Sequence, residues 1–188
     1  MKKALIIFAS PHKDGPTAKL LERFLSGLSP ETWEVETLDV FKTAIRPCVA
    51  CGVCKEKDGC VYSDLDAFDA SFRACDLLII ASPVYNLSFP AQFKAVLDRF
   101  QRYFEARFTR GVRPVMEKKR SAVLLLTMGK NDAFAVEVCE KTLRQSFSIL
   151  NVKLKTVLCL SDTDAGVAED APVFENARIK AIEIDAEL

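Results

Sequence analysis

Four of the seven cysteines fall in one short segment, Cys48-x2-Cys51-x2-Cys54-x5-Cys60. Thiolates three residues apart can turn toward one small inorganic centre, and three such cysteines followed by a fourth are typical of iron–sulfur ligation. Structural zinc more often uses two Cys-x-x-Cys pairs that are well separated in the sequence. The spacing therefore favours an iron–sulfur cluster, with zinc, a redox-active dithiol and a metal-free loop as the alternatives.

A second candidate site is the loop Ser10-Pro-His-Lys-Asp-Gly-Pro-Thr17, which joins an apolar run to a helical pattern. A loop that leads from a strand into a helix points free backbone N–H groups at one spot and favours an anion there. The loop lacks both the dinucleotide Gly-x-Gly-x-x-Gly pattern and the P-loop ending. Its hydroxyl groups suit a terminal monophosphate, and an ordinary strand–turn–helix connection is the alternative. The candidate phosphate contacts are Ser10, His12, Lys13, Gly15, Pro16, Thr17 and Ala18.

Five apolar runs alternate with helical patterns along the chain and predict an α/β doubly wound sheet. Most of the runs are continuously apolar, as in parallel strands buried on both faces, whereas Trp33–Val40 alternates like an edge strand. The predicted strands are Lys3–Ala9, Trp33–Val40, Asp76–Ser82, Ser121–Met128 and Val152–Leu160. Apolar residues at helical spacing predict helices over Thr17–Leu28, Ala91–Phe104, Ala133–Leu150 and Pro172–Ala186. The cysteine-rich loop, at about residues 44–63, interrupts this rhythm.

Two of these stretches resemble the NADPH-dependent FMN reductase branch of the flavodoxin-like superfamily. One is the strand Ala4–Ala9 with the Ser10–Ala18 loop, although the family usually has Asn where this chain has Pro16. The other is Ser82-Pro83-Val84-Tyr85-Asn86, which leads into a helix of pattern Ala-x-x-Lys-x-x-x-Asp-Arg. The cysteine spacing resembles the iron–sulfur flavoproteins of this fold, in which a compact motif holds a [4Fe-4S] cluster near FMN.

The resemblance implies one flavodoxin-like domain over residues 1–188, with a five-stranded parallel sheet of order 2-1-3-4-5 in a three-layer α/β/α arrangement. FMN is then expected at the switch point of the sheet, outside the carboxyl ends of the strands. The loop after Ser82 would surround the flavin ring, and the loop after the fourth strand would approach it closely because of its glycine. The expected ring contacts are Pro83, Val84, Tyr85, Asn86, Leu87, Thr127, Met128 and Gly129.

The same resemblance implies an oxidoreductase in which the flavin carries the chemistry and no side chain is catalytic. NAD(P)H or a ferredoxin would donate electrons, through the cysteine-bound cluster in the latter case, and a small molecule would accept them. A homodimer or homotetramer is expected, with Phe93–Phe108 as a candidate surface. The alternatives are a non-enzymatic electron carrier or redox sensor and a zinc-stabilised binding module without flavin.

Composition excludes several other classes of protein. Lysine plus arginine and aspartate plus glutamate number 26 each, so the net charge is zero and binding of nucleic acid through bulk charge is not expected. His12 is the only histidine, which argues against Ser-His or Cys-His nucleophilic catalysis. The first apolar run is too short for a secretory signal, and no run is long enough to span a membrane, so a cytoplasmic protein is expected.

Two further groups of residues have plain structural interpretations. Cys75, Cys139 and Cys159 lie in or beside apolar elements and are expected to be buried small hydrophobic residues. A basic run is expected to form a solvated face, with an acidic ferredoxin, a nicotinamide phosphate or a neighbouring subunit as its alternative partners. This run comprises Arg99, Arg102, Arg107, Arg110, Arg113, Lys118, Lys119 and Arg120.

Overall fold

The five apolar runs form a parallel sheet in the order β2-β1-β3-β4-β5, in a computed structural model that describes residues 1–188. Every predicted strand is present with its ends displaced by one residue at most, and β2 is an edge strand as expected. The continuous apolar runs are the buried central strands, because only strands covered on both faces need apolar residues at every position. The strands are β1 (Lys2–Phe8), β2 (Trp33–Asp39), β3 (Leu77–Pro83), β4 (Arg120–Thr127) and β5 (Val152–Leu160).

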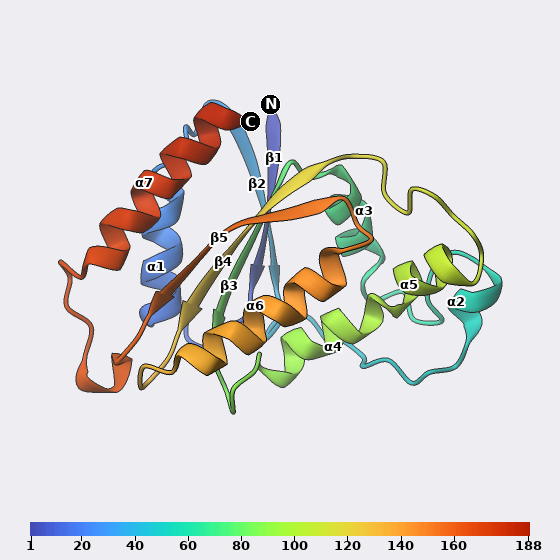
Figure 1. Cartoon of the computed structure of the whole chain (residues 1–188), viewed down its shortest axis with the longest axis horizontal. Coiled ribbons are helices and arrows are strands. Elements are labelled where there is room, and N and C mark those ends of the chain that lie inside the picture. Colours follow the sequence, from blue (N-terminus) through green and yellow to red (C-terminus); the bar gives the residue numbers. More distant parts are fainter.

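Helices cover both faces of the sheet, which confirms the flavodoxin-like three-layer arrangement (Figure 1). On one face α1 (Pro16–Leu25) and α7 (Pro172–Glu187) lie side by side. The opposite face carries α3 (Asp66–Ala74), α4 (Ala91–Arg99), α5 (Gln101–Phe108) and α6 (Ala133–Phe147). Alternate side chains of each strand enter one core or the other, so Leu5 and Ile7 pack with the second group while Ala4 and Ile6 pack with the first. No helix combines the length and the hydropathy that crossing a bilayer requires.

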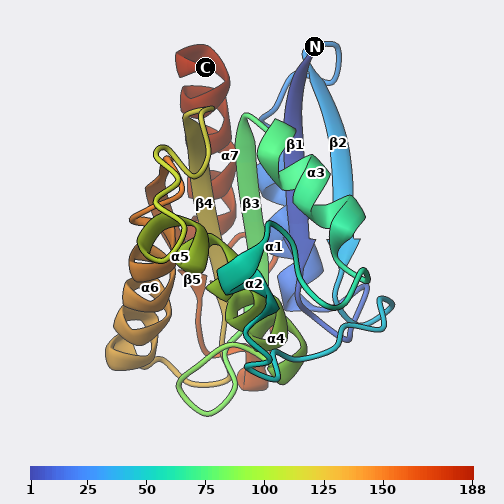
Figure 2. The same ribbon diagram turned by 90° about the vertical axis from the view of Figure 1, so that its right-hand side faces the viewer.

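The helices differ from the predicted ones mainly around the cysteine-rich loop. The helix predicted over Ala91–Phe104 is two helices that meet at Phe100 and continue to Phe108. The sequence did not identify α3, because only Phe68 and Phe72 mark its buried face. The loop itself contains one short helix, α2 (Val53–Glu56), which lies beside α5 (Figure 2).

The interpretation of the basic run as a solvated face is wrong for three of its arginines. Arg99, Arg102 and Arg120 expose only 4%, 9% and 3% of their surface. Arg120 donates hydrogen bonds to the carbonyl of Phe72 in the last turn of α3, at 2.6 Å, and to that of Leu150 just after α6. The negative end of the α3 dipole and the Leu150 carbonyl therefore stabilise this buried cation, although burial still lowers the pKa of Arg120.

Replacing Arg120 with methionine is expected to lower the free energy of unfolding by about 3 kcal/mol, because two buried carbonyl groups lose a charged donor. Urea unfolding followed by circular dichroism measures the change. The matched control is Lys119→Gln at the exposed neighbouring position, which should stay within about 0.5 kcal/mol of the parent. Equal stability of Arg120→Met and the parent would show that these hydrogen bonds do not support the fold.

Candidate functional site

Three loops meet outside the carboxyl ends of β1, β3 and β4. The hydroxyl of Thr17, at the start of α1, lies 2.7 Å from the hydroxyl of Thr127, at the end of β4, and both residues are buried. The backbone N–H of Val84, after β3, donates to the carbonyl of Thr127 at 2.8 Å. The structure therefore brings together the three segments in which the sequence placed its candidate cofactor contacts.

The loop after β1 ends in a helix start that no side chain caps. Gly15 is the residue before α1, and no side-chain hydrogen bond is made there. The first backbone hydrogen bond of this turn runs from the N–H of Lys19 to the carbonyl of Gly15, so the N–H groups of Thr17 and Ala18 have no partner within the helix. Pro16 contributes no N–H. An anion at this end would find two free donors and the positive end of the helix dipole.

Some side chains of the same loop are buried, and others are exposed to solvent. Ser10 is buried, and its hydroxyl both donates to the carbonyl of His12 and accepts from the N–H of His12. His12 itself is exposed. The ammonium group of Lys13 pairs with Asp39 at the end of β2 and lies 4.6 Å from the centre of the Phe8 ring. An ion pair and a ring contact thus hold the Lys13 ammonium between the ends of β1 and β2.

The loop after β3 is a tight turn that presents apolar side chains to solvent. Tyr85 and Ser88 exchange backbone hydrogen bonds of 2.8 and 3.0 Å, and the two residues between them, Asn86 and Leu87, have φ angles of 49° and 63°. Two successive left-handed residues define a type I′ turn, and leucine is unusual in that conformation. Pro83 and Val84 are half-buried, whereas Tyr85 and Leu87 are 44% and 43% exposed. The exposed ring of Tyr85 and the exposed side chain of Leu87 are therefore available to pack against a flat ligand.

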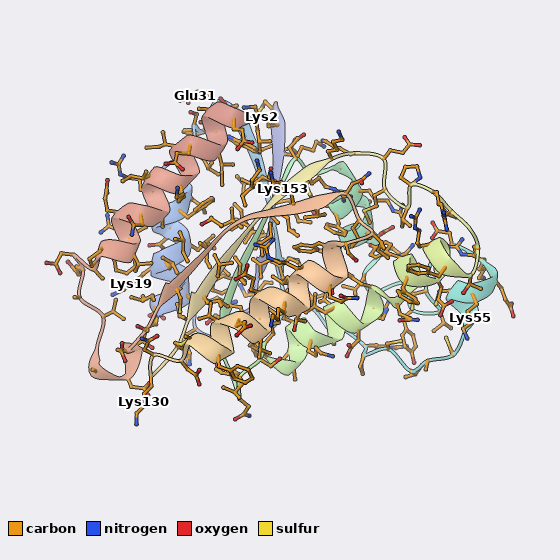
Figure 3. All side chains as sticks on the ribbon, viewed as in Figure 1. Lys2, Lys19, Glu31, Lys55, Lys130 and Lys153 are labelled. Atoms are coloured by element: carbon orange, nitrogen blue, oxygen red, sulfur yellow. The ribbon has the colours of Figure 1, made fainter.

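The loop after β4 is in contact with two acidic residues of the segment that follows β5, Asp162 and Asp164. A Cβ atom on Gly129 would lie 2.4 Å from a carboxylate oxygen of Asp164, so the backbone and that side chain are in close contact. Asp162 accepts a hydrogen bond from the N–H of Asn131 at 3.1 Å. Met128 is buried, and Lys130 projects from this edge of the sheet (Figure 3). No sequence signal connected Asp162 and Asp164 to Gly129, because they follow a different strand.

Cys48, Cys51, Cys54 and Cys60 line one cavity of about 390 Å³. All four are free thiols, and no group of three or more cysteine, histidine or carboxylate side chains stands close enough to hold a metal ion. Ala50, Gly52 and Gly59 have left-handed φ angles of 51°, 81° and 104°, which turn the chain sharply between the cysteines. The opposite wall of the cavity consists of the end of α4 and one side of α5, and includes Arg99, Arg102 and Glu105.

Arg99, at the end of α4, forms hydrogen bonds with both ends of the cysteine segment. Its guanidinium donates to the carbonyls of Arg46 and Tyr62 at 3.0 and 2.9 Å and to the carboxylate of Asp64 at 2.9 Å. Asp64 also accepts from the N–H of Arg46 at 2.8 Å. Burial alone would raise the pKa of Asp64, but these hydrogen bonds outweigh it, and the pKa lies below its ordinary value. These bonds hold the segment before Cys48 and the segment after Cys60 side by side.

The surroundings of the Cys54 thiol disfavour its ionisation. Burial raises its pKa, and negative charge at Glu105, Cys48 and Cys60 raises it further. The remaining cysteines lie outside the cavity, and burial raises the pKa values of Cys75, Cys139 and Cys159 to about 11 each. Cys75 and Cys139 are buried, as expected, and Cys159 is half-buried. These three thiols stay protonated at neutral pH and have little reactivity.

Solved structures with the same fold include an NAD(P)H:quinone oxidoreductase from Methanothermobacter marburgensis. It superposes with a TM-score of 0.68 at 22% identity, over 97% of this chain and 94% of that one. An azoreductase from Bacillus anthracis superposes over the whole of both chains with a TM-score of 0.72 at 16% identity. At these identities the likeness establishes the fold.

Sequence relatives include two archaeal iron-sulfur flavoproteins. The protein from Archaeoglobus fulgidus is 34% identical over 128 residues, which are 68% of this chain and 55% of the relative. The protein from Methanosarcina thermophila is 36% identical over 94 residues, which are 50% of this chain and 49% of the relative. The chain thus matches about half the length of these relatives. Residues 2–161, from β1 through β5 and with all three converging loops, match one family as a unit, and the chain belongs to that family, the NADPH-dependent FMN reductases.

Proposed function

We propose that this protein is an FMN-dependent oxidoreductase that takes electrons from NAD(P)H and passes them to a small acceptor of the quinone class. The observation that carries the proposal is the convergence of the three loops through Thr17, Thr127 and Val84. Family membership supports FMN as the cofactor, and the FMN-dependent NADH:quinone oxidoreductase of Bordetella bronchiseptica, 28% identical over 126 residues, supports the acceptor class. The zero net charge does not favour a carrier that finds its partners by surface charge.

The residues present fit FMN at this edge of the sheet. The uncapped start of α1, with the free N–H groups of Thr17 and Ala18, suits the phosphate, and Lys13 adds a cation. Tyr85 and Leu87 would cover part of the flavin ring, and Gly129, in the loop after β4, is a further proposed contact. Bound FMN supplies hydride and electron chemistry, while these residues bind and orient it and keep one face shielded from water. The remaining proposed contacts are Ser10, His12, Gly15, Pro16, Pro83, Val84, Asn86, Thr127 and Met128.

We also propose that Cys48, Cys51, Cys54 and Cys60 hold a [4Fe-4S] cluster. Four thiols lining one cavity are the donor set that iron–sulfur clusters require. Buried guanidinium groups at Arg99 and Arg102 would offset part of the negative charge of four thiolates. The loop must draw the sulfurs closer together than they stand here. Because α4 begins after the Tyr85 loop and ends at this cavity, one helix of roughly 12 Å joins the two proposed sites.

An anaerobic absorption spectrum combined with FMN, iron and sulfide analysis tests both proposals on the purified protein. The expected result is one FMN per chain, with broad iron–sulfur absorption beneath the flavin bands. A colourless protein that stays colourless after incubation with FMN would contradict the flavin proposal. Bound FMN without iron after anaerobic reconstitution would contradict only the cluster.

Replacing Tyr85 with alanine is expected to weaken FMN binding roughly tenfold, because ring-to-ring contact contributes on the order of 1 kcal/mol beyond buried area. Quenching of FMN fluorescence on titration with apoprotein measures the dissociation constant. Phe108→Ala is the control, since that ring is 58% exposed on α5 and is not part of the three loops. An unchanged dissociation constant for Tyr85→Ala would show that this ring does not touch the flavin.

A further inference from the structure

Two charged side chains of opposite sign face the cysteine cavity from one side of α5. Arg102 and Glu105 are three residues apart and therefore neighbours on the helix surface. Both line the cavity together with the four thiols. Both are also buried, with 9% and 7% of their surface exposed. Buried charges interact more strongly with their surroundings than solvated ones, because water screens them less.

The guanidinium group of Arg102 has two acidic neighbours but leaves one of its N–H donors unpaired. One terminal nitrogen of its guanidinium lies 3.3 Å from Asp69 and 3.8 Å from Asp58. Its Nε–H is buried and has no hydrogen-bond acceptor. A buried donor without an acceptor costs free energy unless another group accepts its proton. A sulfur atom of a cavity-bound cluster is an acceptor of the required charge.

Glu105 carries the negative charge of the two side chains. Its carboxylate accepts hydrogen bonds from the hydroxyl of Thr109 and, at 2.9 Å, from the side-chain amide of Gln101. Both donors are neutral and hold the carboxylate in place. The ammonium group of Lys55, which also lines the cavity, is a cation that acts on this carboxylate. Glu105 thus brings a negative charge to the side of α5 that carries Arg102, and Lys55 offsets part of it.

We propose that Arg102 and Glu105 set the electron affinity of the cluster in this cavity, with the arginine raising its reduction potential and the glutamate lowering it. Reduction adds one negative charge to the cluster. A nearby cation stabilises the reduced form and a nearby anion destabilises it, and charge and hydrogen bonds to sulfur are established controls of cluster potential. This inference rests on the proposed cluster and assigns to each side chain an effect of known sign.

The test is a potentiometric titration of the reconstituted protein, in which EPR detects the reduced cluster and absorbance reports the FMN. Arg102→Gln is expected to lower the cluster midpoint potential, partly because it also frees Asp58 and Asp69. Glu105→Gln, which removes the charge and keeps the size and shape of the side chain, is expected to raise it. Arg102→Lys keeps the charge and should remain near the parent value. Because EPR reports only molecules that contain the cluster, a variant that loads less iron still yields a potential.

Arg107→Gln is the matched control, since Arg107 is on the same helix but does not line the cavity. Its cluster potential, and the FMN potential of every variant, should not change. Shifts of the same sign in Arg102→Gln and Glu105→Gln, or no shift in either, would overturn this proposal while leaving the cluster in place. Parent protein that binds FMN but incorporates no iron would overturn the cluster proposal and this inference with it.

Discussion

Replacing Cys54 with serine is expected to abolish stable iron–sulfur loading and to leave FMN bound. Cys54 lies in α2, in the middle of the cysteine segment, and a serine hydroxyl is a far poorer ligand for iron than a thiolate. The three loops proposed to bind FMN belong to other elements, so their geometry should persist. Iron and sulfide per chain should fall to a small fraction of the parent value, while the flavin absorption remains.

The control for this change is Cys139→Ala, which removes a buried thiol from α6 far along the chain from the cavity. That variant should incorporate as much iron as the parent. If Cys54→Ser retained its full iron content, the four-cysteine assignment would be wrong. Loss of both iron and FMN would instead show that the cysteine segment supports the flavin loops.

Replacing Arg99 with methionine is expected to lower the free energy of unfolding by about 3 kcal/mol, because removing one partner of a buried ion pair leaves the other uncompensated. The variant loses the bonds to Arg46, Tyr62 and Asp64 that close the cysteine segment. The freed segment should be cleaved faster by proteases and should incorporate less iron. Lys94→Met is the matched control on the same helix, because Lys94 forms only an exposed ion pair with Asp98. It should cost less than about 0.5 kcal/mol.

The Arg99–Asp64 pair also predicts a pH dependence. The pKa of Asp64 lies below its ordinary value of 3.8 in the folded protein, so its charged form stabilises the fold above that value. This contribution is lost as pH falls through the folded pKa. The stability difference between the parent and Asp64→Asn, measured by urea unfolding, should be constant from pH 5 to 7, a range above the ordinary value of about 3.8, and should shrink in more acid solution. A difference that did not change with pH would show that the carboxylate charge is not what matters.

The strands could be predicted from the sequence because burial on both faces leaves continuous apolar runs. LLIIA in β3 and AVLLL in β4 have no other ready interpretation in a chain of this size. The division of one predicted helix at Phe100 could not be seen, since the apolar spacing continues through it. The converging loops were identified because parallel strands bring their carboxyl ends to one edge of the sheet.

The surroundings of the cysteines were much less visible in the sequence. A run of arginines usually indicates a solvated face, and nothing local shows that Arg99 and Arg102 turn inward. Their burial depends on Asp64 and Asp69, acids more than 30 residues earlier in the chain whose pairing only the fold establishes. The contact between Gly129 and Asp164 could not be predicted for the same reason, because the fold alone brings these distant residues together.

Anaerobic stopped-flow mixing of the FMN-loaded protein with NADPH or NADH is the decisive test of the assignment as a reductase. The oxidised flavin absorbance is expected to bleach in a single turnover, at a rate that saturates with nicotinamide concentration. A quinone is then expected to restore that absorbance. Flavin that stays oxidised with both nicotinamides, in protein that binds FMN stoichiometrically, would contradict the assignment as a reductase.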